Sequence, residues 1–149
     1  EVSTQTLLDV RQIADQVAAS LAPQTAKRDI SIEVSGQMRL RGEESDLWEL
    51  LRNLMSNAVR YGVNGGWVKV QLSPHTLVVA DNGIGIDQKH IGRLFEKFYR
   101  VDDSRHVEDG GTGLGLAIVA AIINRYGATI HLDSVPGEGS RFTVQFPTA

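Results

Sequence analysis

The chain has 149 residues, of which 42% are hydrophobic, and this length and composition suit one compact domain with a buried core. Its 15 basic and 18 acidic side chains give a net charge of −3, which argues against a nucleic-acid-binding domain, because such domains carry a basic surface. The absence of cysteine excludes a disulfide framework and a thiolate metal site, and it fits a reducing cytosol.

Two helices and two strands are predicted for the first part of the chain. Apolar residues recur at helical spacing from about 6 to 21, and Pro23 is expected to close this helix. Residues 30–34 alternate as a half-buried strand does, and residues 38–41 are a candidate partner for that strand. The second helix is predicted at about 44–61, with acidic residues near its positive N-terminal end.

Strands dominate the rest of the chain, apart from one long irregular stretch and one helix. The stretch from 81 to 113 is rich in glycine and charge, and connections of that length are usually functional. The helix follows at about 114–126. The remaining predicted strands are 67–72, 76–80, 128–132 and 141–146. Because helices and strands are partly segregated along the chain, we predict an α+β fold, a two-layer α/β sandwich.

The helix predicted at 44–61 carries a polar stripe. Residues four apart advance by only about 40° around a helix, so they share one side of it. The stripe consists of Glu49, Asn53, Asn57 and Tyr61. Amide oxygens suit a hard cation such as Mg²⁺ that is shared with substrate phosphates. An ordinary exposed helix face is the alternative interpretation.

Two glycine motifs flank the irregular stretch. In the first, Asp81 directly follows a buried strand, where a carboxylate is poorly solvated unless a donor such as an adenine amine binds it. Gly83 and Gly85 then allow the backbone to approach a flat ligand closely. In the second, four glycines within residues 110–115 open a helix and expose backbone N–H groups to a phosphate. An ordinary Asp-Asn-Gly turn and a flexible linker are the respective alternatives.

Together and in this order, the motifs resemble the nucleotide-binding domain shared by histidine kinases, DNA gyrase, MutL proteins and the large heat-shock chaperones. The likeness covers nearly the whole chain, and its specificity comes from the order and spacing of the motifs. The matching residues are Asn53 and Asn57 for the N box, Asp81, Gly83 and Gly85 for the G1 box, 94–100 for the F box, 111–116 for the G2 box, and Gly137 and Gly139 for the final glycine pair.

Two features of this resemblance favour the kinase branch of the superfamily. The F box is characteristic of histidine kinases. ATPase relatives place a glutamate four residues before the Mg²⁺-binding asparagine, where it activates water, and Asn53 holds that place here. The resemblance therefore implies phosphoryl transfer and not hydrolysis. No histidine begins the His-Glu-x-x-x-Pro type of motif that carries the phosphoacceptor, and the four are His75, His90, His106 and His131.

The resemblance also implies roles for single residues. Asp81 is expected to bind the adenine amino group, and Asn57, supported by Asn53, to hold Mg²⁺ against the phosphates. Tyr61 is expected beside the base or ribose. The candidate phosphate contacts are Arg60 and Arg105, with Lys97 and Arg100 as alternatives. The expected catalytic residues are Asn53, Asn57 and Arg105. Further nucleotide contacts are expected from Gly83, Gly85, Ile86, Gly111, Thr112, Gly113, Leu114 and Gly115.

The implied activity is phosphoryl transfer from Mg·ATP, bound between the helical layer and a mobile lid at roughly 87–111. The acceptor is expected to be a histidine on a separate dimerisation and phosphoacceptor hairpin, followed by an aspartate on a response regulator. Residues 1–22 resemble the segment that follows such a hairpin, and residues 23–149 the catalytic domain. Two alternatives stay open: an ATPase or serine-directed kinase of the same superfamily, and a non-enzymatic module that binds nucleotide to switch protein contacts.

We expect the isolated domain to be soluble, cytoplasmic and monomeric. Its N-terminus lacks the basic and apolar regions of a signal peptide. The longest apolar run, 114–123, is too short and too rich in glycine to cross a bilayer. The chain also lacks a polybasic cluster that would bind an anionic membrane. Membrane attachment is therefore expected only through the parent protein, a sensor of the inner or plasma membrane.

Overall fold

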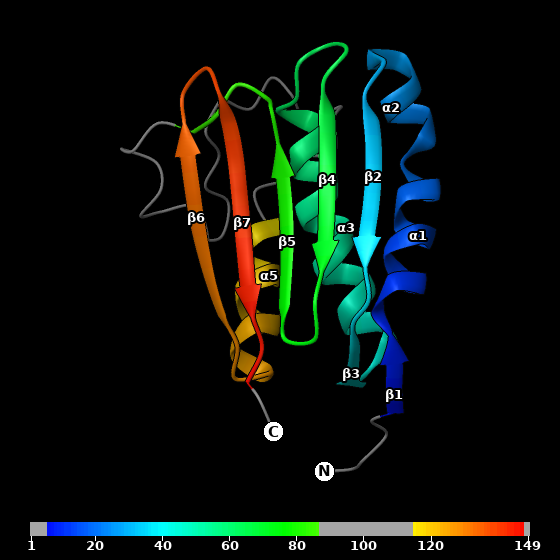
Figure 1. Ribbon diagram of the computed structural model, residues 1–149. Coiled ribbons are helices and arrows are strands. Elements are labelled where there is room, and N and C mark those ends of the chain that lie inside the picture. Colours follow the sequence, from blue (N-terminus) through cyan, green and yellow to red (C-terminus); the bar gives the residue numbers. More distant parts are fainter. Residues whose placement is uncertain (1–5, 87–114, 148–149) are drawn as a thin grey trace.

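The computed structural model describes residues 6–86 and 115–147, which form a two-layer sandwich (Figure 1). A five-stranded sheet forms one layer, and helices cover one of its faces, as the α+β prediction requires. In spatial order the strands are β2 (Ser31–Gly36), β4 (Trp67–Leu72), β5 (Thr76–Asp81), β7 (Gly139–Gln145) and β6 (Thr129–Val135). The described helices are α1 (Val10–Ser20), α2 (Ala22–Arg28), α3 (Glu44–Arg60) and α5 (Gly115–Arg125).

A separate two-stranded sheet corrects the prediction of a helix at 6–21. Residues 6–9 form β1 (Thr6–Asp9), which pairs antiparallel with β3 (Arg39–Gly42), and α1 begins only at Val10. Asp9 is extended, and its carboxylate accepts a hydrogen bond from the Gln12 backbone N–H at 3.3 Å. A side chain that satisfies a free N–H in this way marks the start of a helix.

The strand pairing predicted for 38–41 is also wrong. Residues 39–42 pair with β1, whereas β2 pairs with β4, in the sheet's one parallel pairing among the described strands. Pro23 does not close a helix; it lies in the first turn of α2. Proline suits that position because its fixed φ is helical and the N–H that it lacks would have no partner there.

Helix α3 is the central helix of the helical layer, and its bounds agree closely with the prediction of 44–61. Its apolar residues recur at helical spacing, so they form one buried face. The buried residues are Leu47, Leu50, Leu51, Leu54, Met55, Ala58 and Val59. Burying one large aliphatic side chain contributes about 1.5–3 kcal/mol. This face fixes the rotation of α3 about its axis, and with it the direction of the polar stripe.

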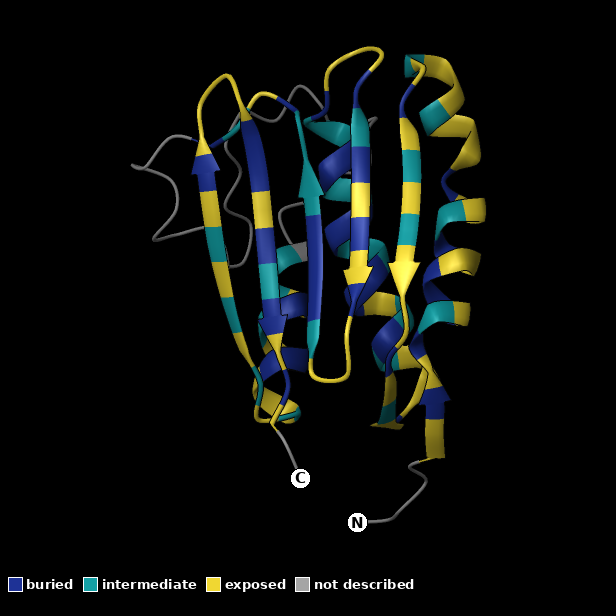
Figure 2. Cartoon of the chain, in the orientation of Figure 1, coloured by how far each residue is buried: buried dark blue, intermediate teal, exposed yellow. Residues whose placement is uncertain are grey.

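The other face of the sheet is turned towards solvent. Buried and exposed residues alternate along β4 in Figure 2, as they do in a sheet that is covered on one side. The Lys69 ammonium group lies 4.6 Å from the centre of the Trp67 ring on this strand. Within 6–86 and 115–147, none of the helices has the length and apolar character needed to cross a membrane.

The packing of α3 predicts a large difference between two leucine truncations. Leu51 is fully buried, whereas Leu7 on β1 is 53% exposed. We expect Leu51→Ala to lower the free energy of unfolding by about 2–5 kcal/mol, because it leaves a cavity in the core. The matched control Leu7→Ala should cost less than about 1 kcal/mol. Urea denaturation followed by circular dichroism measures both, and equal losses would contradict the assignment of α3 to the core.

Candidate functional site

The first glycine motif lies where β5 ends beside the C-terminal end of α3. The Asp81 carboxylate accepts a hydrogen bond from the Gly83 backbone N–H at 2.8 Å. The next residue, Ile84, donates its N–H to the Tyr61 carbonyl oxygen at 3.0 Å. A Cβ on Gly83 would collide with that same carbonyl oxygen, so glycine is required for this approach. The motif therefore brings Asp81 next to the last residues of the polar stripe.

A second contact fixes the far side of the same turn. Gly85 has a φ of 76°, and a Cβ on it would collide with the Val135 carbonyl oxygen. The Gly137 N–H donates to the Ile84 carbonyl oxygen at 2.7 Å. The glycines predicted to approach a ligand thus have a role in the fold itself, since they let the turn pack against α3 and β6. Their contact with a nucleotide remains a prediction.

Asp81 lies in an environment that disfavours its charge. Burial raises the pKa of the Asp81 carboxyl above its ordinary value of 3.8, and backbone hydrogen bonds from Gly83 and Ser140 oppose this rise. A desolvated carboxylate gains from any further donor that reaches it. The exocyclic amine of a purine is such a donor. The geometry is therefore suited to the role predicted for Asp81.

The polar stripe of α3 is occupied by contacts within the helix. The Asn57 Oδ1 accepts a hydrogen bond from the Arg60 Nη1 at 3.3 Å. The Asn53 Nδ2 donates to the Glu49 carbonyl oxygen at 2.7 Å and reaches the Glu49 carboxylate at 3.4 Å. The Arg60 guanidinium lies 5.5 Å from the centre of the Tyr61 ring. The structure therefore connects Asn57, Arg60 and Tyr61, while Asn53 is bound to Glu49.

Arg60 also leaves a polar atom without a partner. Its Nε is buried and, like the Nε atoms of Arg11 and Arg52, has no hydrogen-bond acceptor within the described part of the chain. A buried donor without a partner is costly, and a phosphate oxygen is an acceptor of suitable charge. No cluster of three or more acidic, histidine or cysteine residues occurs in the described ranges. The Asn57 Oδ1, which among the described residues accepts only a 3.3 Å hydrogen bond from Arg60, is a hard oxygen of the kind that Mg²⁺ binds beside phosphates and water.

Arg28 positions this end of α3, and the sequence analysis gave it no role. Its guanidinium donates to three backbone carbonyls at the end of the helix, from Val59 at 2.7 Å, Arg60 at 3.0 Å and Gly62 at 2.5 Å. Carbonyls in the last turn of a helix and just beyond it point towards its negative end, so a cation suits them, and the Val59 carbonyl also accepts from the Gly62 N–H at 3.1 Å. The only sequence signal is a basic residue at the end of α2, which does not reveal contacts more than 30 residues away.

Two serines, also absent from the predictions, anchor the loop that follows Asp81. The Ser134 hydroxyl accepts a hydrogen bond from the Ile86 N–H at 2.6 Å, and it lies 2.8 Å from the Ser140 hydroxyl. Both serines are buried. Ile86, a predicted nucleotide contact, is itself 3% exposed, and its contact with a ligand remains a prediction. Ser134 and Ser140 face each other across β6 and β7, a register that only strand pairing reveals.

Several predicted residues lie outside the residues that the structure describes. They include the predicted lid at 87–111 and most of the second glycine motif. The residues are Lys97, Arg100, Arg105, Gly111, Thr112, Gly113 and Leu114. Gly115, the last residue of that motif, begins α5. The described part of the site therefore consists of the G1 turn and the end of α3.

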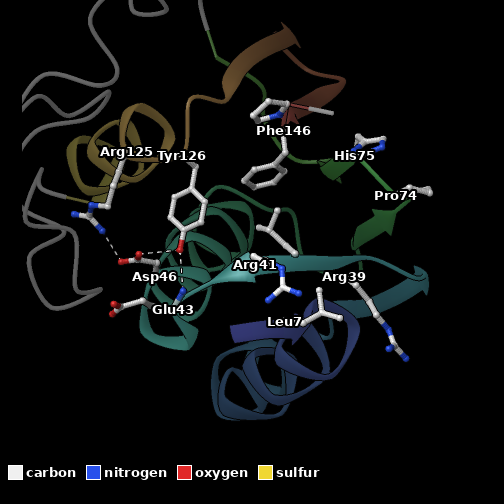
Figure 3. A pocket seen from close by; sticks show the side chains of 12 residues that line it. Leu7, Arg39, Arg41, Glu43, Asp46, Pro74, His75, Arg125, Tyr126 and Phe146 are labelled. Atoms are coloured by element: carbon white, nitrogen blue, oxygen red, sulfur yellow. Dashed lines mark hydrogen bonds and ion pairs between the residues drawn. The ribbon is translucent and has the colours of Figure 1, made fainter. Parts of the chain in front are cut away.

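A groove of about 710 Å³ lies at the other end of the molecule (Figure 3). Apolar side chains such as Leu7 and Phe146 line it beside Asp46, Arg125 and Tyr126. No residue that the sequence analysis predicted for the nucleotide site contributes to this groove. The groove is thus separate from the arrangement of Asp81 and Asn57.

The fold and the site together define a nucleotide-binding domain of the two-layer α/β type. The family described as histidine kinase-, DNA gyrase B- and HSP90-like ATPase matches residues 42–149, and the chain belongs to this family. The chain is 44% identical over 125 residues to the phosphate regulon sensor protein PhoR of Pseudomonas aeruginosa, covering 80% of this chain and 28% of PhoR. It is 40% identical over 124 residues to the sensor histidine kinase RppB of Synechocystis, covering 80% of this chain and 27% of RppB.

Solved structures of histidine kinases have the same fold. The mycobacterial sensor histidine kinase MprB matches with a TM-score of 0.79 and 26% identity, over 97% of each chain. Full-length ShkA, in complex with AMPPNP, matches with a TM-score of 0.83 and 25% identity, over 99% of this chain and 32% of ShkA. The predicted class is confirmed: this is an ATP-binding catalytic domain of the sensor histidine kinase type. The chain spans less than a third of the length of PhoR and RppB.

The environment of Asp81 predicts how stability changes with pH in the unliganded domain. Because burial raises its pKa, the stability contributed by the protonated carboxyl is fully present below about pH 3.8 and is lost as the pH rises through the raised pKa. Asp81→Asn keeps an oxygen that can accept from Gly83 and removes the charge. Its free energy of unfolding, relative to wild type, should therefore increase between pH 4 and pH 7 in urea denaturation. A difference that stays constant or decreases over this range would contradict the desolvation of Asp81.

Proposed function

We propose that this chain is the catalytic domain of a two-component sensor histidine kinase. It binds Mg·ATP at the end of β5 and α3, and transfers the γ-phosphoryl group to a histidine on a separate dimerisation and phosphoacceptor hairpin. The observation that carries this proposal is the desolvated Asp81 carboxylate beside the end of α3, where Asn57 and the unpartnered Nε of Arg60 lie.

Each described residue has a distinct role in the proposal. Asp81 accepts a hydrogen bond from the adenine amino group. Arg60 turns from Asn57 to the phosphates, which frees the Asn57 amide oxygen to hold the metal ion. Tyr61 packs beside the base or ribose. Bound Mg²⁺ neutralises phosphate charge, on which phosphoryl transfer largely depends.

The remaining predicted contacts are part of the same proposal. Residues 87–111 form a lid over the nucleotide, and Arg105 contacts the phosphates, with Lys97 and Arg100 as alternative cations. Gly83, Gly85, Ile86 and residues 111–115 complete the nucleotide contacts. These roles rest on the resemblance to the family motifs, since most of these residues lie outside the described ranges.

The environment of Asn53 supports transfer over hydrolysis. An amide is not a base, so Asn53 cannot take a proton from an attacking water. Its Nδ2 is bound to the Glu49 carbonyl oxygen, and Glu49 is exposed one turn earlier on the helix. With an amide in place of a base at position 53, a bound nucleotide retains its γ-phosphoryl group until an acceptor side chain arrives. This is the behaviour that a histidine kinase requires.

The proposal extends to the parent protein and its partners. Relatives such as PhoR and RppB are named as sensor proteins, and this chain corresponds to only part of each. We infer a parent with a phosphoacceptor hairpin and a membrane-bound sensor region, with this domain, monomeric when isolated, on the cytoplasmic side. The phosphoryl group then passes to an aspartate on the receiver domain of a response regulator.

Two substitutions test the nucleotide site. Asp81→Asn removes the charged acceptor for the adenine amine, which should cost about 1.5–3 kcal/mol, or about 10- to 150-fold in Kd. Asn57→Ala should weaken binding and reduce its dependence on Mg²⁺. Calorimetric titration with AMPPNP, with and without Mg²⁺, measures both effects. Asp133→Asn is the matched control, because Asp133 is an exposed strand carboxylate paired with His131. Wild-type affinity in both site variants would refute the assignment.

Phosphotransfer in trans tests the reaction itself. Incubated with radiolabelled ATP, the domain alone should acquire no label, whereas an added phosphoacceptor hairpin from the parent should acquire acid-labile label. Tethering normally gives such an acceptor an effective concentration of about 1 mM. The untethered reaction should therefore be slow and should depend on hairpin concentration. Rapid release of phosphate with an unlabelled hairpin would indicate an ATPase. Nucleotide binding with neither reaction would indicate a non-enzymatic switch.

A further inference from the structure

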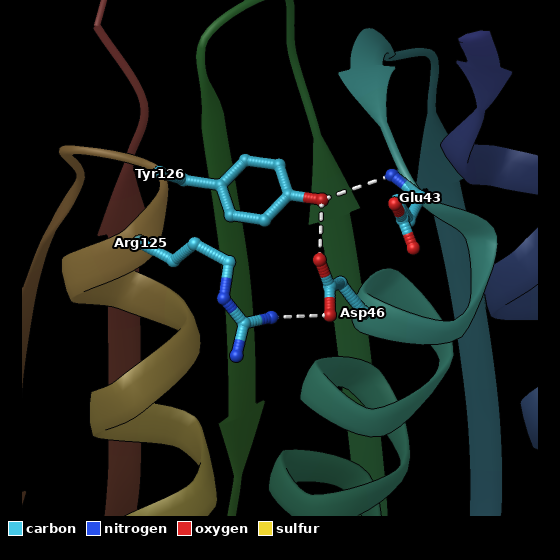
Figure 4. A network of polar contacts seen from close by, with 4 residues as sticks. All are labelled: Glu43, Asp46, Arg125 and Tyr126. Carbon is cyan, nitrogen blue, oxygen red and sulfur yellow. Dashed lines mark hydrogen bonds and ion pairs between the residues drawn. The ribbon is translucent and has the colours of Figure 1, made fainter. Parts of the chain in front are cut away.

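The N-terminal end of α3 is capped by the side chain of Tyr126, the residue directly after α5. Glu43 occupies the N-cap position, and its own side chain makes no capping hydrogen bond. The Glu43 backbone N–H instead donates to the Tyr126 hydroxyl at 3.0 Å, and this hydroxyl donates to the Asp46 Oδ2 at 2.9 Å (Figure 4). In a capping box, the acidic residue at the position of Asp46 binds the N-cap N–H directly. Here the Tyr126 hydroxyl bridges the two groups.

The Tyr126 side chain is held in place on several sides. A Cβ on Gly42 would collide with its hydroxyl, so glycine is needed there for the ring to fit. The Phe146 ring packs edge-on against it, with the ring centres 6.2 Å apart. The neighbouring Arg125 binds the other Asp46 carboxylate oxygen at 2.5 Å. We call the group Asp46, Arg125 and Tyr126 the α3–α5 latch.

The hydroxyl of the latch remains a donor at neutral pH. Burial raises the pKa of Tyr126 and Asp46 raises it further, while a hydrogen bond from the Glu43 N–H and the charge of Arg125 oppose the rise. The proton shared with Asp46 therefore stays on the hydroxyl oxygen. The Tyr126 hydroxyl can then accept from Glu43 and donate to Asp46 at the same time.

The latch and the nucleotide site lie at opposite ends of the same two helices. α3 and α5 pack against each other and run antiparallel (Figure 1). Asn57 lies about three turns beyond Asp46 on α3, and Gly115 lies about three turns before Arg125 on α5. The start of α5, where the second glycine motif ends, therefore points to the same end of the sandwich as Asn57. A helix is stiff over three turns. A shift of α5 relative to α3 at the latch therefore also moves the start of α5 relative to Asn57.

We infer that Tyr126 is a positioning residue for the nucleotide site, because its hydroxyl completes the cap of α3 and so fixes the start of α5 relative to Asn57. This inference rests on the proposed function. Removal of the hydroxyl deletes none of the residues predicted to contact the nucleotide. It changes only the position of those residues relative to one another. Small errors of position are costly at such sites, since a misplacement of about 1 Å can lower a catalytic rate by about 100-fold.

Tyr126→Phe is the test, because it keeps the ring against Gly42 and Phe146 and removes only the hydroxyl. We expect the Kd for AMPPNP with Mg²⁺, measured by calorimetry, to rise about tenfold, which corresponds to about 1.4 kcal/mol of binding free energy. Asp46→Asn, which keeps an oxygen for Tyr126 and removes the charge paired with Arg125, should give a smaller rise. Ser20→Ala is the matched control: it removes a hydroxyl that donates to the Val17 carbonyl oxygen at 2.7 Å on α1, and the Kd should not change.

Calorimetry and urea denaturation together separate misplacement from unfolding. Irreversibly misfolded molecules lower the binding stoichiometry, whereas reversible unfolding raises the apparent Kd by the reciprocal of the folded fraction, which urea denaturation measures. A Kd in Tyr126→Phe that rises well beyond this correction, at unchanged stoichiometry, supports the inference. An unchanged Kd, with or without a lower free energy of unfolding, overturns it and leaves the proposed function intact. Failure of the wild-type domain to bind AMPPNP would overturn the proposed function, and this inference with it.

Discussion

The buried face of α3 is the constraint on which the rest of the structure depends. Its seven apolar residues fix the rotation of the helix against the sheet and the neighbouring helices, so the polar stripe with Asn57 must face away from the core. Side chains from outside α3 bind backbone groups at both of its ends. Arg28 from α2 binds the carbonyls at one end, and Tyr126, directly after α5, binds the N-cap N–H at the other. The helix is thus fixed in position as well as in rotation.

The described part of the site retains interactions that are unfavourable in the unliganded fold. The Asp81 carboxyl is desolvated, and the buried Nε of Arg60 has no acceptor among the described residues. The core beneath them is, by contrast, closely packed and apolar. Such local costs are typical of sites that bind a ligand, because the ligand supplies the missing donors and acceptors. The arrangement is consistent with a nucleotide that brings an amine to Asp81 and phosphates to Arg60.

The spacing of apolar residues predicted the helices and strands whose bounds depend on neighbouring residues. It failed where a strand pairs with a segment far away in the sequence. The bounds of α3 and β4 follow from their apolar spacing and from the glycines between them. The helix predicted at 6–21 is wrong at β1 because those residues are held by β3, about 30 residues away, and nothing in their own pattern reveals the partner. The same limit applies to the bond from Tyr126 to Asp46, which joins residues 80 positions apart. Family motifs indicated Asp81 and Asn57, but no motif contains Arg28, Ser134 or Tyr126.

The central claim is that the nucleotide lies where the end of β5 meets the polar stripe of α3. A crystal structure of this domain with AMPPNP and Mg²⁺ tests that claim most directly. The account predicts the adenine amino group within hydrogen-bonding distance of the Asp81 carboxylate, and the phosphates beside Asn57 and Arg60. A nucleotide in the groove beside Tyr126, or a base that makes no contact with Asp81, would contradict it.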